Sequence, residues 1–208
     1  MKNIFGTLIF AALSTVITPA AAITAVGGYN FEDNAFADTL ISSSGGYSVT
    51  GDSLAAALTD KNPGTFALST TLGVTDFVQL GFTDNVLVNG LGADLVLFEL
   101  GVPSVFGVSI TIGGTTRSYA SVSTGAQAGG FGLNAAAIDL SDFGIAFGAS
   151  LSSIVILMGD ASNTQPSLSL VGALNSRELG SQIPEPASLS LAVIALLGLA
   201  ATRRRPSL

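Results

Sequence analysis

The side chains of this chain that can do chemistry are almost all carboxylates. The 208 residues include no histidine and no cysteine. That composition excludes Ser-His-Asp and Cys-His nucleophiles, histidine zinc sites and thiol redox chemistry. Carboxylate catalysis and the binding of hard cations remain. Ca²⁺ takes roughly six to eight oxygen ligands, so loops rich in Asp, Asn and Thr are its candidate sites.

One such loop follows a short apolar segment and has the sequence DKNPGTFA, beginning at Asp60. Asp60, Asn62 and Thr65 are the candidate ligands of a structural Ca²⁺, because a Pro-Gly turn can aim backbone carbonyls at an ion. The alternative is an Asx-type turn that holds no ion. The sequence favours neither.

A second loop is flanked by Asp84 and Asp94 and closed by Gly90 and Gly92. We expect it to fold back and bring the two carboxylates together as further cation ligands. Asp94 and Glu99 are five positions apart on a predicted strand, so they point to opposite faces and form no acid–base pair. The alternative is that these residues only mark strand ends.

Two further groups of acidic residues receive structural roles. The segment Glu32-Asp33-Asn34, with Asp38, is interpreted as a solvated loop, and Asp139 and Asp142 as helix-capping or turn residues. No site is assigned to them.

Short strands must position these groups. Period-two alternation and buried apolar runs predict strands at residues 77–82, 94–99, 108–112, 153–158 and 167–173. Gly113-Gly114 predicts a hairpin turn. One short helix is expected at residues 52–58, capped by Asp52 or Ser53, and residues 125–136 are expected to form an irregular loop. The pattern predicts an all-β fold, a jelly-roll-like β-sandwich.

This sandwich is expected to span residues 23–175, followed by a polar linker at residues 176–182. Between residues 23 and 182, thirteen carboxylates oppose Lys61, Arg117 and Arg177, a net charge of −10. Nucleic acid is therefore excluded as a partner, because phosphate binding needs clustered Lys and Arg. With no cysteine, burial must hold the domain together, with or without a metal.

The first 22 residues predict a secretory signal peptide. Lys2 provides a positive start, residues 4–16 are apolar, and Ala20 and Ala22 occupy the small-residue positions before the cleavage site. Ile23 is then the first mature residue, signal peptidase is a partner, and the protein is exported across the inner membrane.

The C-terminal segment, residues 183–208, has three parts: a short motif of Pro184, Glu185 and Pro186, an apolar stretch, and the basic cluster Arg203, Arg204 and Arg205. A transmembrane helix is predicted at about residues 185–202, since about 20 apolar residues cross a bilayer. The positive-inside bias keeps the arginines in the cytoplasm.

The order of these three parts resembles the PEP-CTERM sorting signal of Gram-negative bacteria. The resemblance implies that an exosortase recognises the segment and cleaves near Pro184-Glu185-Pro186, so contact with the inner membrane is transient. It also implies a protein of the cell envelope, cell surface or secreted matrix, linked to exopolysaccharide and biofilm.

The Asp60 loop is similar to a D-x-N-x-x-T loop of discoidin-type, galactose-binding-like jelly rolls. That resemblance implies a structural calcium. Phe66 stands where the family usually carries tryptophan, and Lys61 adds a positive charge.

We therefore expect a non-enzymatic surface or matrix protein, delivered by the exosortase route and associated with polysaccharide. The alternative is a calcium-stabilised carbohydrate-binding module. An exported hydrolase with two carboxylates is the third hypothesis, and no spacing singles out its acid pair.

Overall fold

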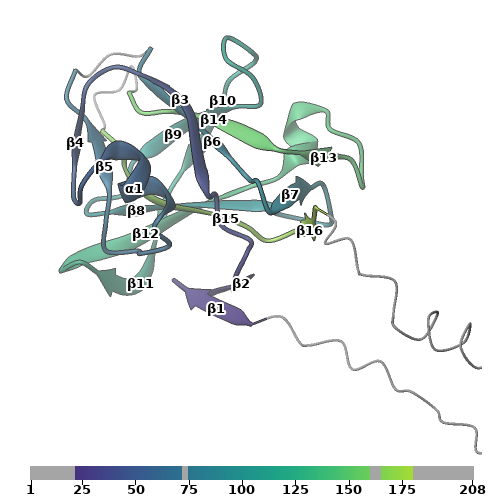
Figure 1. Cartoon of the computed structure of the whole chain (residues 1–208), viewed down its shortest axis with the longest axis horizontal. Coiled ribbons are helices and arrows are strands. Elements are labelled where there is room, and N and C mark those ends of the chain that lie inside the picture. The colour runs from purple at the N-terminus through teal and green to yellow at the C-terminus, as the bar shows by residue number, and fades with distance from the viewer. Residues whose placement is uncertain (1–21, 72–74, 160–164, 180–208) are drawn as a thin grey trace, which may run out of the picture.

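The computed structural model describes residues 22–71, 75–159 and 165–179, and these residues form mainly antiparallel strands (Figure 1). The order of the five-stranded sheet is β10 (Arg117–Ala120), β9 (Val105–Ser109), β14 (Ser153–Leu157), β6 (Phe77–Gly81) and β3 (Thr39–Ser44). The order of the six-stranded sheet is β11 (Val122–Ala128), β12 (Phe131–Ile138), β8 (Leu95–Leu100), β15 (Ser167–Ala173), β5 (Ala67–Ser69) and β4 (Tyr47–Val49). These sheets confirm the predicted all-β sandwich.

Two smaller sheets adjoin the sandwich. β1 (Ile23–Val26) and β2 (Tyr29–Glu32) form a hairpin, and β13 (Ser150–Leu151), β7 (Asn85–Val88) and β16 (Ser176–Glu178) form a three-stranded sheet. Figure 1 shows the three-stranded sheet at one end of the sandwich and α1 (Leu54–Thr59), with β4 and β5, at the other. The first three residues of the predicted linker thus form β16, because they pair with the edge of β7 as an antiparallel strand.

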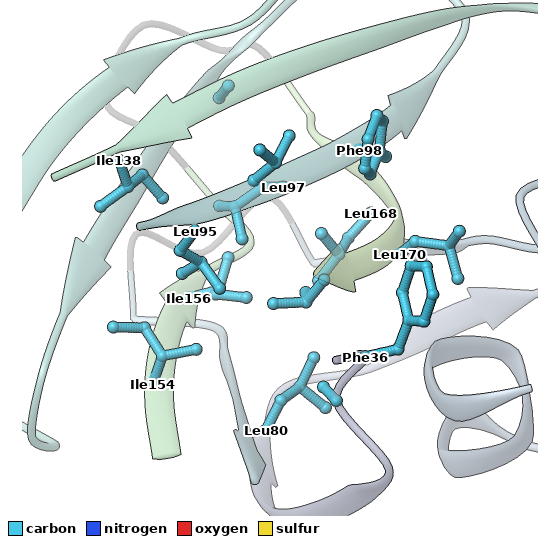
Figure 2. Close-up of a cluster of buried hydrophobic side chains, with 14 of the residues drawn as sticks. Phe36, Leu80, Leu95, Leu97, Phe98, Ile138, Ile154, Ile156, Leu168 and Leu170 are labelled. Carbon is cyan, nitrogen blue, oxygen red and sulfur yellow. The ribbon is translucent and has the colours of Figure 1, made fainter. Parts of the chain in front are cut away.

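The hydrophobic core lies between the two larger sheets. Figure 2 shows aliphatic side chains from β8, β14, β6 and β15 gathered there, among them Leu95, Leu97, Ile154, Ile156 and Leu80. All five are fully buried. Burial of an aliphatic side chain is worth roughly 1.5–3 kcal/mol, so this layer supplies much of the driving force for folding.

β8 is buried on both faces, as its apolar sequence predicts. Its second face is covered by the β1–β2 hairpin. The ring of Phe98 packs edge-on against Phe31 and Tyr29, with centroid separations of 5.9 Å in both pairs. Gly172 on β15 makes room for Phe31, since a Cβ atom there would lie 2.6 Å from the ring. The hairpin is therefore anchored to the six-stranded sheet.

The predicted strands are present with shifted ends, and the turn at Gly113-Gly114 joins the antiparallel pair β9 and β10. The predicted helix is α1, whose N-cap Ser53 accepts a hydrogen bond from the amide of Ala56 at 3.1 Å. Asp139 caps the 3₁₀ helix η1 (Leu140–Phe143) by accepting from the amide of Ser141, which holds the pKa of its carboxyl below the usual range.

The prediction of an irregular loop at residues 125–136 is wrong. β11 and β12 pair across this segment, and Gly129 and Gly130 form the turn between them with φ of 56° and 85°. Alanine and glycine carry almost no hydrophobic period, so the alternation of this hairpin is invisible in the sequence. Two adjacent glycines with positive φ are nevertheless the usual signature of a tight hairpin turn.

The predicted signal peptide up to residue 21, the C-terminal sorting segment and its apolar stretch at residues 185–202 lie outside the described residues. Within the described part of the chain, no helix is long and apolar enough to span a membrane.

Candidate ligand-binding cleft

An open cleft of about 350 Å³ lies where the β1–β2 hairpin meets the three-stranded sheet. Its size is at the lower end of the roughly 300–1,000 Å³ typical of small-molecule sites. The exposed apolar side chains of Ile23 and Phe147 line it together with polar side chains. These polar residues are Asn30, Glu32, Asn89, Asn175 and Ser176.

The β1–β2 hairpin provides the first wall. Gly27 and Gly28 both have positive φ, as a two-residue turn of type I′ requires. Burial of Phe31 between its neighbours leaves Asn30 and Glu32 exposed on the other face of β2. Among the described residues, neither exposed side chain has a hydrogen-bond partner, so both are available to a ligand.

Asn89 fixes the second wall, the loop at residues 145–149. Its amide donates to the carbonyl of Ala149 at 2.9 Å, and its carbonyl accepts from the amide of Gly148 at 2.7 Å. Its side-chain Nδ2 donates to the carbonyl of Ile145 at 2.6 Å. Three hydrogen bonds from one buried residue thus hold the loop that presents the ring of Phe147, which is 73% exposed.

Asp94 fixes the third wall. Its Oδ1 accepts from the amide of Gly90 at 2.7 Å and from Nδ2 of Asn175 at 2.8 Å, and its Oδ2 accepts from the amide of Leu140 at 2.9 Å. A Cβ atom at residue 90 would lie 2.5 Å from Nδ2 of Asn175, so only glycine permits this approach. The fully buried carboxylate therefore joins two segments that line the cleft, at Gly90 and Asn175.

One buried side-chain oxygen of the cleft lining lacks a hydrogen-bond donor. Oδ1 of Asn89 has no hydrogen-bond partner among the described residues. An unsatisfied buried polar group costs about 1–3 kcal/mol. The unpaired Oδ1 of Asn89 therefore lowers the stability of the fold. The residue nevertheless positions the loop that carries Phe147 through its other three hydrogen bonds.

The electrostatic character of the cleft is neutral to acidic. Of the described residues that line it, none is Lys or Arg, and Glu32 is the charged one. Amide and carboxylate groups offer donors and acceptors to hydroxyl groups, while an aromatic ring offers an apolar face. The lining suits an uncharged ligand that carries several hydroxyl groups.

The predicted ligands Asp60, Asn62 and Thr65 do lie together, in the loop after α1. The amide of Asn62 donates to Oδ1 of Asp60 at 2.9 Å, and Oγ1 of Thr65 lies 3.0 Å from both carboxylate oxygens. The amide of Gly64 donates to Oδ1 of Asn62 at 2.9 Å. These are Asx-type turns, the alternative that the sequence left open, and calcium at this loop stays a prediction.

Asp84 and Asp94 are not brought together. The carbonyl of Asp84 accepts from the amide of Leu179, whereas that of Asp94 accepts from the amide of Leu174, so strands β7 and β16 lie between them. The loop does close, with the amide of Gly90 donating to Oδ1 of Asp94, but β7 separates this turn from Asp84 at the other end of the strand. In the described ranges, no group of three or more acidic side chains is arranged to hold a metal.

Asp84 lies instead beside Asp38. Oδ2 of Asp38 accepts hydrogen bonds from Oγ1 of Thr83 at 2.9 Å and from the amide of Asp84 at 3.3 Å. Partial burial and the neighbouring Asp38 carboxyl raise the pKa of Asp84, while Lys61 opposes the rise. Two carboxylates share this exposed turn.

Sequence reasoning missed the residues that line the cleft. Asn30, Asn175 and Phe147 belong to no acidic motif and stand in three distant segments. The one local signal was Gly27-Gly28 between two short alternating runs, which predicts the hairpin. Their convergence depends on the anchoring of that hairpin by buried rings, a tertiary contact.

Comparison with protein families gives one match. The family described as the PEP-CTERM protein-sorting motif matches residues 182–205. Curated proteins and solved structures give no match to the chain. The resemblance to discoidin-type jelly rolls is therefore not confirmed.

Proposed function

We propose, from the premise that residues 182–205 form a PEP-CTERM protein-sorting motif, that this chain is a non-enzymatic protein of the cell surface or extracellular matrix, associated with exopolysaccharide or biofilm. The motif implies export through the envelope of a Gram-negative bacterium and an exosortase as the processing partner. This family match is the observation that carries the proposal.

The placement of the carboxylates supports a non-enzymatic role. Asp94 and Glu99 are fully buried, and each accepts three hydrogen bonds from the protein. Asp38, beside Asp84, accepts hydrogen bonds from Thr83 and from the amide of Asp84. A glycosidase needs two carboxylates facing a bound sugar about 5–10 Å apart, and only Glu32 lines the described cleft.

Processing tests the proposal. Pro184, Glu185 and Pro186 are replaced together by alanine in a host that carries an exosortase. We expect the variant to accumulate as an uncleaved precursor in the membrane fraction, while the parent protein is converted to a shorter form. Immunoblots of the membrane, surface and medium fractions measure this. Equal processing of both chains would contradict the proposal.

A second candidate is a calcium-stabilised carbohydrate-binding module with a jelly-roll arrangement. The cleft beside Phe147 favours sugar binding, and the oxygen-rich loop at Asp60 favours an ion. Calcium that binds only the folded state raises the melting temperature by mass action. We expect Ca²⁺ to raise it relative to chelator in the parent and not in Asp60→Ala. Identical melting temperatures in calcium and chelator would remove the ion from this candidate.

A further inference from the structure

We propose that the cleft between the β1–β2 hairpin and the three-stranded sheet is a binding site for a neutral saccharide. One sugar unit stacks on the exposed face of Phe147. Its hydroxyl groups bond to the side chains of Asn30, Glu32 and Asn175. The proposal rests on the proposed function only for the source of the sugar, an envelope or matrix polysaccharide.

The chemistry of the lining selects this class of ligand. A sugar ring has an apolar face made of C–H groups and an edge made of hydroxyls that both donate and accept. Phe147 offers a flat apolar surface, and the amide of Asn30 offers a donor and an acceptor. Glu32 is an acceptor for hydroxyl hydrogens. An aromatic surface beside the unpaired side-chain amide of Asn30 thus complements both parts of a sugar.

Charge excludes the other small ligands. A phosphate, a sulfate or a uronic acid needs a basic side chain, and the described lining contains none. A divalent cation is usually bound by more than one carboxylate, and Glu32 is the single carboxylate in the described lining. A neutral, polyhydroxylated molecule needs neither a basic side chain nor a set of cation ligands, and its hydroxyl groups can donate to the Glu32 carboxylate.

The site is organised before any ligand arrives. Asn89 holds the Phe147 loop by three hydrogen bonds, and Asp94 holds Asn175 and Gly90 by its Oδ1. With its Nδ2 donating to Asp94, Asn175 is left with Oδ1 as a free acceptor: none of the described groups donates to it. Pre-organised groups lose less entropy when a ligand binds. Asn89 and Asp94 act as positioning residues.

The test is a titration of the exported protein, isotope-labelled and purified in a detergent without a sugar headgroup. The probes are neutral di- and trisaccharides of glucose, galactose, mannose and N-acetylglucosamine. We expect saturable shifts of the amide signals of Asn30, Asn175 and Phe147 with at least one probe. The same amides should not shift with a trisaccharide of glucuronic acid.

Two variants locate the binding. Phe147→Ala removes the stacking surface and should weaken the affinity about tenfold, and Asn30→Ala should weaken it several-fold. Phe131→Ala is the matched control, because Phe131 is another exposed phenylalanine, 49% exposed against 73% for Phe147, and lies on β12, outside the cleft. It should change the affinity less than about twofold. Amide spectra of each variant check that it is folded.

Two results would overturn the proposal. One is the absence of saturable shifts at the cleft with every neutral probe. The other is an equal loss of affinity in Phe147→Ala and Phe131→Ala. Either result leaves exosortase processing of the Pro184-Glu185-Pro186 motif untouched, so the failure of this inference is distinct from the failure of the proposed function.

Discussion

The two ends of β8 each carry a fully buried carboxylate, and the groups that donate to them differ. Asp94, before the strand, accepts from two backbone amides and from Nδ2 of Asn175. Glu99, near its other end, accepts from the amide and hydroxyl of Ser104 and from the hydroxyl of Ser121. All three partners of Asp94 are N–H groups, which can only donate, whereas two of the three partners of Glu99 are hydroxyls.

The type of donor decides how well each site tolerates a change of the carboxylate. A hydroxyl rotates and can accept as well as donate, but a backbone N–H cannot reverse its role. The amide of Ser104 also has a second acceptor, Oγ of Ser121 at 3.0 Å. The surroundings of Glu99 can therefore adapt to a change of donor and acceptor. The surroundings of Asp94, at the edge of the cleft, cannot adapt in this way.

Amide substitutions test this asymmetry and have the largest expected effect. In Asp94→Asn the new NH₂ group must face an N–H donor, so one buried amide loses its acceptor, at a cost of about 2–3 kcal/mol. In Glu99→Gln the NH₂ group can donate to the hydroxyl of Ser104. We expect a loss of about 1 kcal/mol or less there. Urea denaturation of parent and variants measures both.

Equal losses in the two variants would break the comparison. They would mean that total burial, not the type of donor, sets the cost of replacing a buried carboxylate. A change in the slope of the urea transition would show instead that the denatured state had changed.

Asn85 presents the reverse case, a buried side chain with donors and acceptors but no partner among the described residues. Asn85→Leu removes unsatisfied polar atoms while nearly conserving volume, and should raise the free energy of unfolding by about 1–2 kcal/mol. Asn134→Leu is the control, because Nδ2 of Asn134 donates to the carbonyl of Gly101 at 3.1 Å. The control should lose stability. Destabilisation by both would contradict the assignment of Asn85 as unpaired.

The exposed turn at Asp84 extends the comparison to the surface and has the smallest expected effect. Because burial and Asp38 raise the pKa of Asp84, its contribution to stability is fully present below the unfolded value of roughly 3.9 and is lost as pH rises through the folded value. Asp84→Asn abolishes this titration. Its melting temperature relative to the parent should therefore increase slightly from pH 3 to pH 7.

Asp52→Asn is the matched control, since it changes the net charge equally and Asp52 is exposed with no hydrogen-bond partner in the part of the chain that the structure describes. An identical pH trend in Asp52→Asn and Asp84→Asn would assign the effect to net charge. It would then not reflect the pair with Asp38.

Much of the sandwich was predictable because its central strands carry a strong hydrophobic signal. The apolar sequence of β8 and β14 predicts burial, and Ser53 predicts the start of α1. The hairpin of β11 and β12 was not predictable from period, since alanine and glycine give no contrast between the two faces.

The cleft was less predictable than the strands. The sequence drew attention to acidic residues, and Asp94 does adjoin the cleft, as a fully buried carboxylate whose oxygens accept three hydrogen bonds from the protein. Phe147 and Asn175 acquire a role only through the hydrogen bonds of Asn89 and Asp94. Such contacts join segments far apart in the sequence, so local sequence patterns do not predict them.

Amide hydrogen exchange at Leu140 tests the central claim, that Asp94 joins three segments through N–H groups that can only donate, whereas the partners of Glu99 can adapt. In Asp94→Asn, Oδ1 can keep its two donors, so the amide of Leu140 is the group that loses its acceptor. Its exchange should become about tenfold faster in Asp94→Asn and stay at the parent rate in Glu99→Gln. Unchanged protection of Leu140 in Asp94→Asn, or equal acceleration in both variants, would contradict the account.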